Sequence, residues 1–197
     1  MTAGVLQTAP RFVSIGGVST RYISARHTSG KPPSASAGVI VVSDVHGIDH
    51  RVIVELADGL AARGFEVFIP DIFRGAAWSS QKTSSGYASW EESISMDRVL
   101  SDVAATAGFM LSESIANIAI LGLGWGGGVA MKASAAVRLN RYKACICVYS
   151  SKITLEDVRT IGCPTLFLFR EESRLVGPRL CVCELWCPAH AFLCVPM

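Results

Sequence analysis

The sequence has few charged residues and no excess of either sign. Charged side chains make up 17% of its 197 residues, against about 25% in an average soluble protein. Its 18 basic and 16 acidic residues give a net charge of +2, a balance that argues against a protein that binds nucleic acid or another polyanion. Half of the residues are apolar, which excludes a disordered chain and predicts a large core in one domain of ordinary size.

The sequence also lacks a long apolar run of the kind that crosses a membrane. Its longest uncharged stretch, residues 114–131, approaches the ~20 residues that a bilayer requires. That stretch contains five glycines, and its first half is rich in β-branched residues, a pattern typical of a strand, a turn and a helix. We therefore expect no membrane span, and we expect no secretion signal because the N-terminal residues do not have its pattern.

Acidic residues are absent from the first part of the chain. The first of them is Asp44, and four basic residues precede it among many serines and threonines, a composition typical of an organelle-targeting segment. The same region predicts a β-hairpin, because apolar runs at residues 12–15 and 18–24 flank the Gly16-Gly17 pair, which suits a two-residue turn. We favour the hairpin and a cytoplasmic location, with an organelle as the alternative.

The seven cysteines do not form an evident disulfide framework. Their number is odd, and Cys145, Cys147 and Cys163 lie in or beside apolar strand-like runs, which favours a reducing compartment and a packing role. A second group near the C-terminus could suggest zinc: Cys181, Cys183, Cys187, His190 and Cys194. Its Cys-Val-Cys spacing fits a structural zinc site poorly, so we predict no metal and no cofactor.

Apolar patterning predicts strands that alternate with helices. Runs of apolar and β-branched residues indicate strands buried on both faces at residues 38–43, 65–69, 115–121, 144–149 and 164–169. Helical spacing predicts helices over residues 49–63, 96–111 and 126–137, with Asp49 as the N-cap of the first. Residues 70–91 are expected to form a long loop, which in a compact domain is usually functional or mobile.

This order of elements predicts the fold class. Strands that alternate with helices indicate an α/β fold with a mostly parallel sheet and helices on both faces, here preceded by the hairpin. We expect three regions: the hairpin and a linker over residues 1–37, the α/β domain over 38–173, and a divergent C-terminal tail over 174–197.

A glycine-rich turn joins the third buried strand to the helix that follows it. Gly122, Gly124 and Gly127 match G-x-G-x-x-G, the phosphate-binding fingerprint of dinucleotide folds. That fingerprint normally follows the first strand and needs an acidic residue about 20 positions later, and neither condition holds here. The turn also fits the nucleophile elbow G-x-Nu-x-G, with Gly122 and Gly126 as the flanking glycines and Gly124 at the position of the nucleophile.

Four motifs, in this order and spacing, resemble the dienelactone hydrolase family of α/β-hydrolases over roughly residues 11–172. They are Val42-Ser43-Asp44-Val45-His46-Gly47, Pro70-Asp71-Ile72-Phe73-Arg74-Gly75, Gly122-Leu123-Gly124-Trp125-Gly126-Gly127 and Cys163-Pro164-Thr165-Leu166-Phe167-Leu168-Phe169. Within that family, the motifs resemble the subgroup that includes carboxymethylenebutenolidase-like and plant glucanase-like members. It implies an α/β-hydrolase fold and hydrolysis of small esters or lactones.

The resemblance also implies the layout of a catalytic site. In that family a Cys at the elbow attacks the carbonyl carbon, a His accepts its proton, and an Asp orients the His. By position, the backbone N–H groups of Val45 and Trp125 would hold the oxyanion. Asp44 occupies the place of an acidic residue that the family uses near the nucleophile.

The catalytic positions themselves depart from the family. Gly124 stands where the nucleophile belongs, Ser173 stands where the acid belongs, and His190 follows Ser173 too closely for the family's further strand and helix. We therefore expect a dienelactone hydrolase-like protein that is weakly active or inactive. A pseudo-hydrolase that binds a small molecule or a partner without catalysis is the alternative, and a dinucleotide-binding protein is less favoured.

Two more side chains are candidates for the pocket. His46 follows the first buried strand and could transfer a proton, and Arg74 in the long loop could bind a substrate carboxylate. Trp78 and Trp90 either line the pocket or cover an edge of the sheet. The expected ligand is a small ester or lactone. Because the family's last strand and helix are not evident, we expect the sheet to expose an apolar edge through which copies could associate.

Overall fold

A computed structural model of the chain describes residues 11–25, 37–78, 84–135, 141–151 and 153–168, together with the backbone of residues 181–186 and 191–196. The predicted N-terminal hairpin is confirmed. It consists of β1 (Arg11–Ile15) and β2 (Val18–Ile23), which pair antiparallel across a two-residue turn. The hairpin belongs to the main sheet, because β2 also pairs antiparallel with β4 (Glu66–Pro70).

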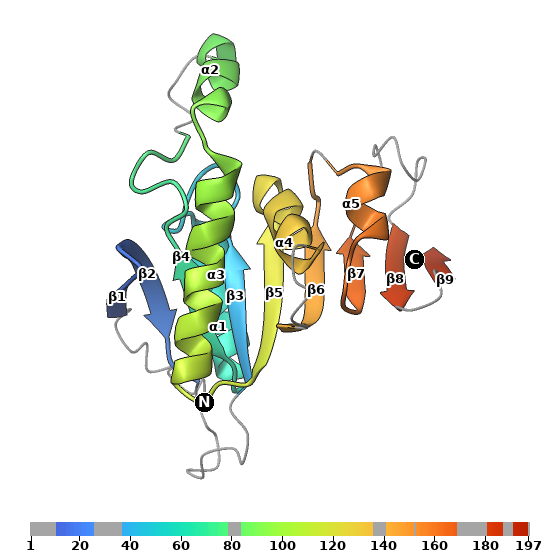
Figure 1. Cartoon of the computed structure of the whole chain (residues 1–197), viewed down its shortest axis with the longest axis horizontal. Coiled ribbons are helices and arrows are strands. Elements are labelled where there is room, and N and C mark those ends of the chain that lie inside the picture. Colours follow the sequence, from blue (N-terminus) through green and yellow to red (C-terminus); the bar gives the residue numbers. More distant parts are fainter. Residues whose placement is uncertain are drawn as a thin grey trace, which may run out of the picture.

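One nine-stranded sheet runs through the molecule in the order β1-β2-β4-β3-β5-β6-β7-β8-β9. Its centre is parallel, as predicted, and is formed by β4, β3 (Ala37–Val42), β5 (Asn117–Leu123), β6 (Tyr142–Val148) and β7 (Thr165–Leu168). Its two ends are antiparallel. The α/β fold class is thus confirmed, and the carboxyl ends of the central strands meet along one edge of the sheet (Figure 1).

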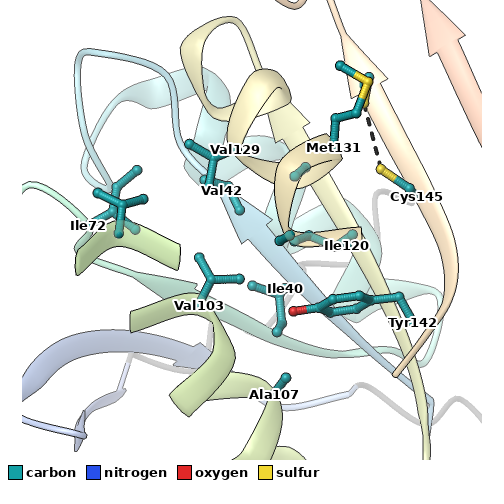
Figure 2. Packing of buried hydrophobic residues seen from close by; sticks show 14 of the residues in the cluster. Ile40, Val42, Ile72, Val103, Ala107, Ile120, Val129, Met131, Tyr142 and Cys145 are labelled. Carbon is teal, nitrogen blue, oxygen red and sulfur yellow. Dashed lines mark hydrogen bonds between the residues drawn. The ribbon is translucent and has the colours of Figure 1, made fainter. Parts of the chain in front are cut away.

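Helices cover both faces of the sheet because successive residues of each central strand point to opposite sides. On β3, Ile40 and Val42 pack in the core beneath α3 (Met96–Ser112) and α4 (Trp125–Ala135), as Figure 2 shows for that face. Val39 and Val41 pack on the other face with α1 (Arg51–Ala62). All four of these strand residues are almost completely buried.

The face of the sheet that packs against α1 is less well covered at β6 and β7 than at β3. On β6, Cys145 and Cys147 are buried on the α4 face, whereas Ile146 is only partly buried on the α1 face. On β7, Phe167 is buried and its neighbours Leu166 and Leu168 are half-buried. The alternation of side chains therefore leaves a row of half-exposed aliphatic groups on the α1 face of these two strands.

Two local predictions are wrong. The first helix begins at Arg51 with His50, not Asp49, as its N-cap residue, because the Asp49 carboxylate pairs with the guanidinium of Arg21 on β2. The segment 70–91 is not a continuous loop, because it contains the short turn η1 (Ser84–Gly86) and the start of α2 (Tyr87–Glu92). A six-residue helix is too short to show a helical period in the sequence, and this one is held by Trp90, which is buried.

The tail also differs from expectation. With no further strand evident, the sequence predicts an open edge at β7, but β7 pairs antiparallel with β8 (Cys181–Trp186), which pairs with β9 (Ala191–Pro196). The backbone hydrogen-bonding groups at the outer side of β7 are therefore paired, and β9 becomes the end of the sheet. Within the described part of the chain, no helix is both long and apolar enough to cross a membrane.

Candidate active site

The glycine-rich turn has the backbone geometry of a nucleophile elbow. Gly124 connects β5 to α4 with φ = +52°, in the left-handed region that is unfavourable for other L residues. A Cβ at Gly122 would lie 2.1 Å from the carbonyl oxygen of Gly126, and a Cβ at Gly126 would lie 2.3 Å from that of Ser43. Strand β5, helix α4 and the end of β3 therefore approach each other at distances that only glycine allows at both flanking positions.

The central position of the elbow has room for a side chain but carries none. A Cβ at Gly124 would lie 3.4 Å from Asp44 Cβ, which is near an ordinary contact. The turn is held by backbone hydrogen bonds: the Gly124 N–H donates to Val148 O at 2.9 Å, and Gly124 O accepts from Gly127 N and Ser151 N, each at 3.1 Å. The geometry that displays a nucleophile is thus present, and the attacking atom is missing.

The two residues carried over as oxyanion donors lie on adjacent segments of the same sheet edge. Strands β3 and β5 are parallel neighbours, with Val42 opposite Gly122, so the loop that holds Val45 and the start of α4 at Trp125 leave the sheet together. Among the hydrogen bonds of the described residues, neither backbone N–H is used as a donor. The N–H of Trp125 is also at the N-terminus of α4, where the helix dipole favours negative charge.

The loop that carries Val45 is fixed by its neighbours. The Asp44 carboxylate accepts from the backbone N–H of His46 at 3.0 Å, and Asp44 O accepts from Gly47 N at 3.1 Å. Val45 O accepts from Trp78 N at 2.7 Å. These contacts fix the loop and tie it to the segment that follows β4, and Asp44 lies next to Gly124.

An aromatic cluster, defined as Phe73, Trp78, Tyr87, Trp90 and Trp125, packs beside the elbow. Phe73 lies 5.3 Å from both Trp90 and Trp125 between ring centroids, and Trp90 lies 5.6 Å from Trp78 and 5.5 Å from Tyr87. Trp78 and Trp90 therefore pack against each other. The cluster places α2 near the first residue of α4.

Glu91 on α2 is a site-adjacent residue that the sequence did not reveal. Its carboxylate accepts from the indole N–H of Trp125 at 3.1 Å, and the indole N–H of Trp90 donates to Ala76 O at 2.7 Å. The two tryptophans are largely buried, so these hydrogen bonds satisfy indole groups that burial would otherwise leave unpaired. In the sequence, the Trp90-Glu91 pair was the only feature that could have drawn attention to Glu91, and it lies in a segment that was predicted to be a loop.

Arg74, a candidate ligand for a substrate carboxylate, has a carboxylate partner inside the protein. Its Nη2 donates to Asp102 Oδ1 at 2.9 Å, and Arg98 donates to Asp102 Oδ2 at 3.0 Å. Asp102 is on α3, and its side chain is only 7% exposed. The arrangement ties the segment after β4 to α3, and a role of Arg74 in binding substrate remains a prediction.

His46 is exposed and lies in the loop after β3. Its Nδ1 is 3.3 Å from Trp78 O, and its ring centroid is 5.1 Å from that of His50. These contacts place it on the segment next to Asp44, but none of them joins its ring to Gly124. Proton transfer by His46 therefore also remains a prediction.

The buried cysteines do not provide a replacement nucleophile. Cys145 and Cys147 lie in the core, as predicted, with exposures of 0% and 1% and sulfur atoms 3.7 Å apart. Hydrogen bonding with Cys145 and burial raise the pKa of the Cys147 thiol, whereas hydrogen bonding with Cys147 lowers the pKa of the Cys145 thiol. Neither sulfur is accessible to a substrate, because both side chains are almost completely buried. Ser173 and His190, the positions of the family's acid and base, lie outside the described residues.

Comparisons with known proteins identify a family for this chain. The model of the dienelactone hydrolase family matches residues 23–179. A carboxymethylenebutenolidase homolog of Mus musculus is 29% identical over 161 residues, which are 81% of this chain and 64% of that protein. An endo-1,3;1,4-beta-D-glucanase of Zea mays is 22% identical over 146 residues, 74% of this chain and 46% of that protein. The chain thus spans less than two thirds of these relatives.

The fold has a counterpart among solved structures. The crystal structure of a putative dienelactone hydrolase from Klebsiella pneumoniae superposes with a TM-score of 0.68 at 16% identity, covering 85% of this chain and 75% of that one. At that identity the likeness concerns the fold alone.

Proposed function

Since the chain belongs to the dienelactone hydrolase family, we propose that it binds a small ester or lactone at the elbow and hydrolyses it weakly or not at all. The observation that carries this proposal is Gly124: an elbow with φ = +52° and two obligatory flanking glycines, but with hydrogen in place of the nucleophilic side chain. The curated relatives extend beyond the matched region, so the activity is a proposal about this chain and not a property transferred from them.

The residues present support binding of a carbonyl group. A carbonyl oxygen placed between the N–H groups of Val45 and Trp125 would accept from both, and the two donors gain strength as negative charge develops on that oxygen. In an acyl transfer the sulfur or oxygen atom of the elbow side chain forms a bond to the carbonyl carbon, and the base accepts the proton of that thiol or hydroxyl group. At Gly124 no sulfur or oxygen can form that bond, so no acyl-enzyme arises at this position.

The expected loss of turnover can be estimated from hydrolases that use the same kind of nucleophilic mechanism. In a serine protease, removal of the nucleophile or of the whole triad costs on the order of 10⁶ in turnover and leaves about 10³–10⁴ over the reaction in water. That remainder comes from the oxyanion donors and from binding. We infer at most a comparable remainder for this chain.

A purely binding role is the second candidate. The aromatic cluster supports it, because Trp125 is fixed by Glu91 and by its contact with Phe73, which gives the elbow a preformed shape. A dinucleotide role has less support. Strand β6 ends at Val148, and the described residues that follow it offer no carboxylate before Glu156 to bind a ribose.

The test is a comparison of the protein with its Gly124→Ala variant. Turnover of p-nitrophenyl acetate is measured for both, and each is treated with an electrophilic acyl probe and mapped by mass spectrometry. We expect equal, near-background rates and no acylated residue at the elbow. A rate well above background that Gly124→Ala abolishes, or an acyl group mapped to residues 122–126, would contradict the proposal. Saturable binding of a non-hydrolysable lactam to a protein without turnover would favour the binding role.

A further inference from the structure

A pocket lies at the opposite edge of the sheet from the elbow. It has a volume of about 310 Å³ and is lined, in the part of the chain that the structure describes, by residues of the hairpin, the start of β4 and the end of α3: Arg11, Val13, Tyr22, Glu66, Phe68, Phe109, Glu113 and Ile115. Figure 1 shows that end of α3 far from α2, which lies beyond the other end of the helix. From this lining we propose that the pocket binds a small organic cation that carries one aromatic ring.

The apolar part of the pocket is a row of aromatic rings. Tyr22 and Phe68 are opposite each other in the β2–β4 pairing, with ring centroids 4.9 Å apart, and Phe109 on α3 lies 6.0 Å from Phe68 in an edge-on arrangement. Phe68 is 3% exposed, whereas Tyr22 and Phe109 are partly exposed. A volume of this size, at the small end of ligand pockets, suits a single ring.

Among the described residues that line the pocket, negative charges outnumber positive ones. Glu66 and Glu113 contribute two carboxylates against one guanidinium from Arg11. The Glu66 carboxylate is oriented by hydrogen bonds at one oxygen, from the Tyr22 hydroxyl at 2.7 Å and from Ala25 N at 3.1 Å. Among the described residues Glu113 has no ion-pair or hydrogen-bond partner for its carboxylate. An ammonium group would find there an acceptor without an internal partner.

Arg11 shows that the aromatic wall accepts a cation. Its guanidinium carbon lies 6.0 Å from the centroid of the Tyr22 ring, at the limit of a cation–π contact. Arg11 is the exposed first residue of β1, and its guanidinium forms no ion pair with a described carboxylate. A ligand ammonium held by Glu113 would compete with Arg11 for the same ring face. The two charges would also repel each other. Arg11 therefore opposes binding of a cation, and the preference for a cation over an anion rests on the two carboxylates, Glu66 and Glu113.

The proposal is tested with phenethylammonium chloride, titrated into the whole chain by calorimetry and by saturation-transfer NMR. Phenylacetate, an anion of similar size, is the matched ligand. We expect saturable binding of the cation with a Kd at or below about 1 mM and binding of the anion weaker by a factor of about 10 or more. Equal affinity for the two ions, or no saturation by the cation, would overturn the proposal.

Three variants locate the site. Glu113→Gln removes an exposed carboxylate and should weaken cation binding about 2- to 5-fold, and Arg11→Met should strengthen it by a similar factor, because partly exposed charge pairs have energies of this order. Glu92→Gln on α2, an exposed carboxylate at the other end of α3, is the control and should change nothing. If Glu113→Gln and Arg11→Met shift the affinity in the same direction, or if neither shifts it, the assignment is wrong. The elbow takes no part in this test, so the outcome is independent of the function proposed above.

Discussion

Replacing Gly124 with alanine places one methyl group on a backbone that L residues avoid. The new Cβ would lie 3.4 Å from Asp44 Cβ, so steric overlap is a minor cost. The backbone at φ = +52° costs an L residue about 1–2 kcal/mol, while the stiffer unfolded chain offsets about 0.4–1 kcal/mol of that. We expect a net destabilisation of about 1 kcal/mol, which for a chain of this length lowers Tm by about 2–4 °C.

The measurement is thermal unfolding followed by circular dichroism, with Gly108→Ala as the control. Gly108 lies within α3 and is exposed, and a Cβ added there would meet no heavy atom within 4 Å outside the backbone of its own helix. Alanine there should stabilise the helix by about 1 kcal/mol. The same chemical change is thus expected to move Tm down at the elbow and up in the helix. A Gly124→Ala protein that melts at or above the unmodified chain would refute the argument from backbone geometry.

Gly124→Cys extends the same reasoning to activity. It supplies a thiol at the place of the missing nucleophile and should lower Tm as alanine does. We expect no gain in ester turnover, because Ser173, at the position of the family's acid, has no carboxyl group and the spacing of His190 departs from that of the family's base. An active Gly124→Cys variant would show that this chain does provide an acid and a base.

Three further perturbations test the packing around the site. Asp102→Ala should destabilise the chain by about 2 kcal/mol in urea unfolding, because it leaves Arg74 and Arg98 without their largely buried partner. An unchanged free energy of unfolding would contradict a stabilising role of these ion pairs. The pKa of Asp157 is lowered: partial burial acts against this, but hydrogen bonds from Lys132 and Thr154 outweigh it. The folded carboxyl therefore binds protons less readily than the unfolded one, so its contribution is full above the unfolded pKa of about 3.9 and is lost as pH falls through the folded value. Asp157→Asn should accordingly reduce the loss of stability in acid, measured as Tm against pH. Finally, we expect the chain to self-associate through the half-exposed row on β6 and β7, and Leu168→Lys should shift sedimentation towards the monomer. Unchanged sedimentation would exclude that face.

The sequence alone determined the features that depend on local patterning. Unbroken apolar runs located the hairpin and the central strands, and helical spacing located helices α1, α3 and α4, all to within a few residues, because each of these patterns lies within one short segment of the chain. The elbow could also be predicted from the sequence, because Gly122, Gly124 and Gly126 lie within five consecutive residues. The close backbone approaches that require glycine at positions 122 and 126 occur within this turn or against the end of β3.

Only the tertiary structure decided which distant side chains meet. Asp49 pairs with Arg21 on β2 and does not cap α1. Arg74 pairs with Asp102, which is 28 positions further along the chain. Helix α2 has no period of its own and is positioned by aromatic contacts and by the bond from Trp125 to Glu91. Such pairings have no signature in local sequence, because an ion pair or a ring contact depends on the distance between side chains in space, which the packing of the whole sheet sets.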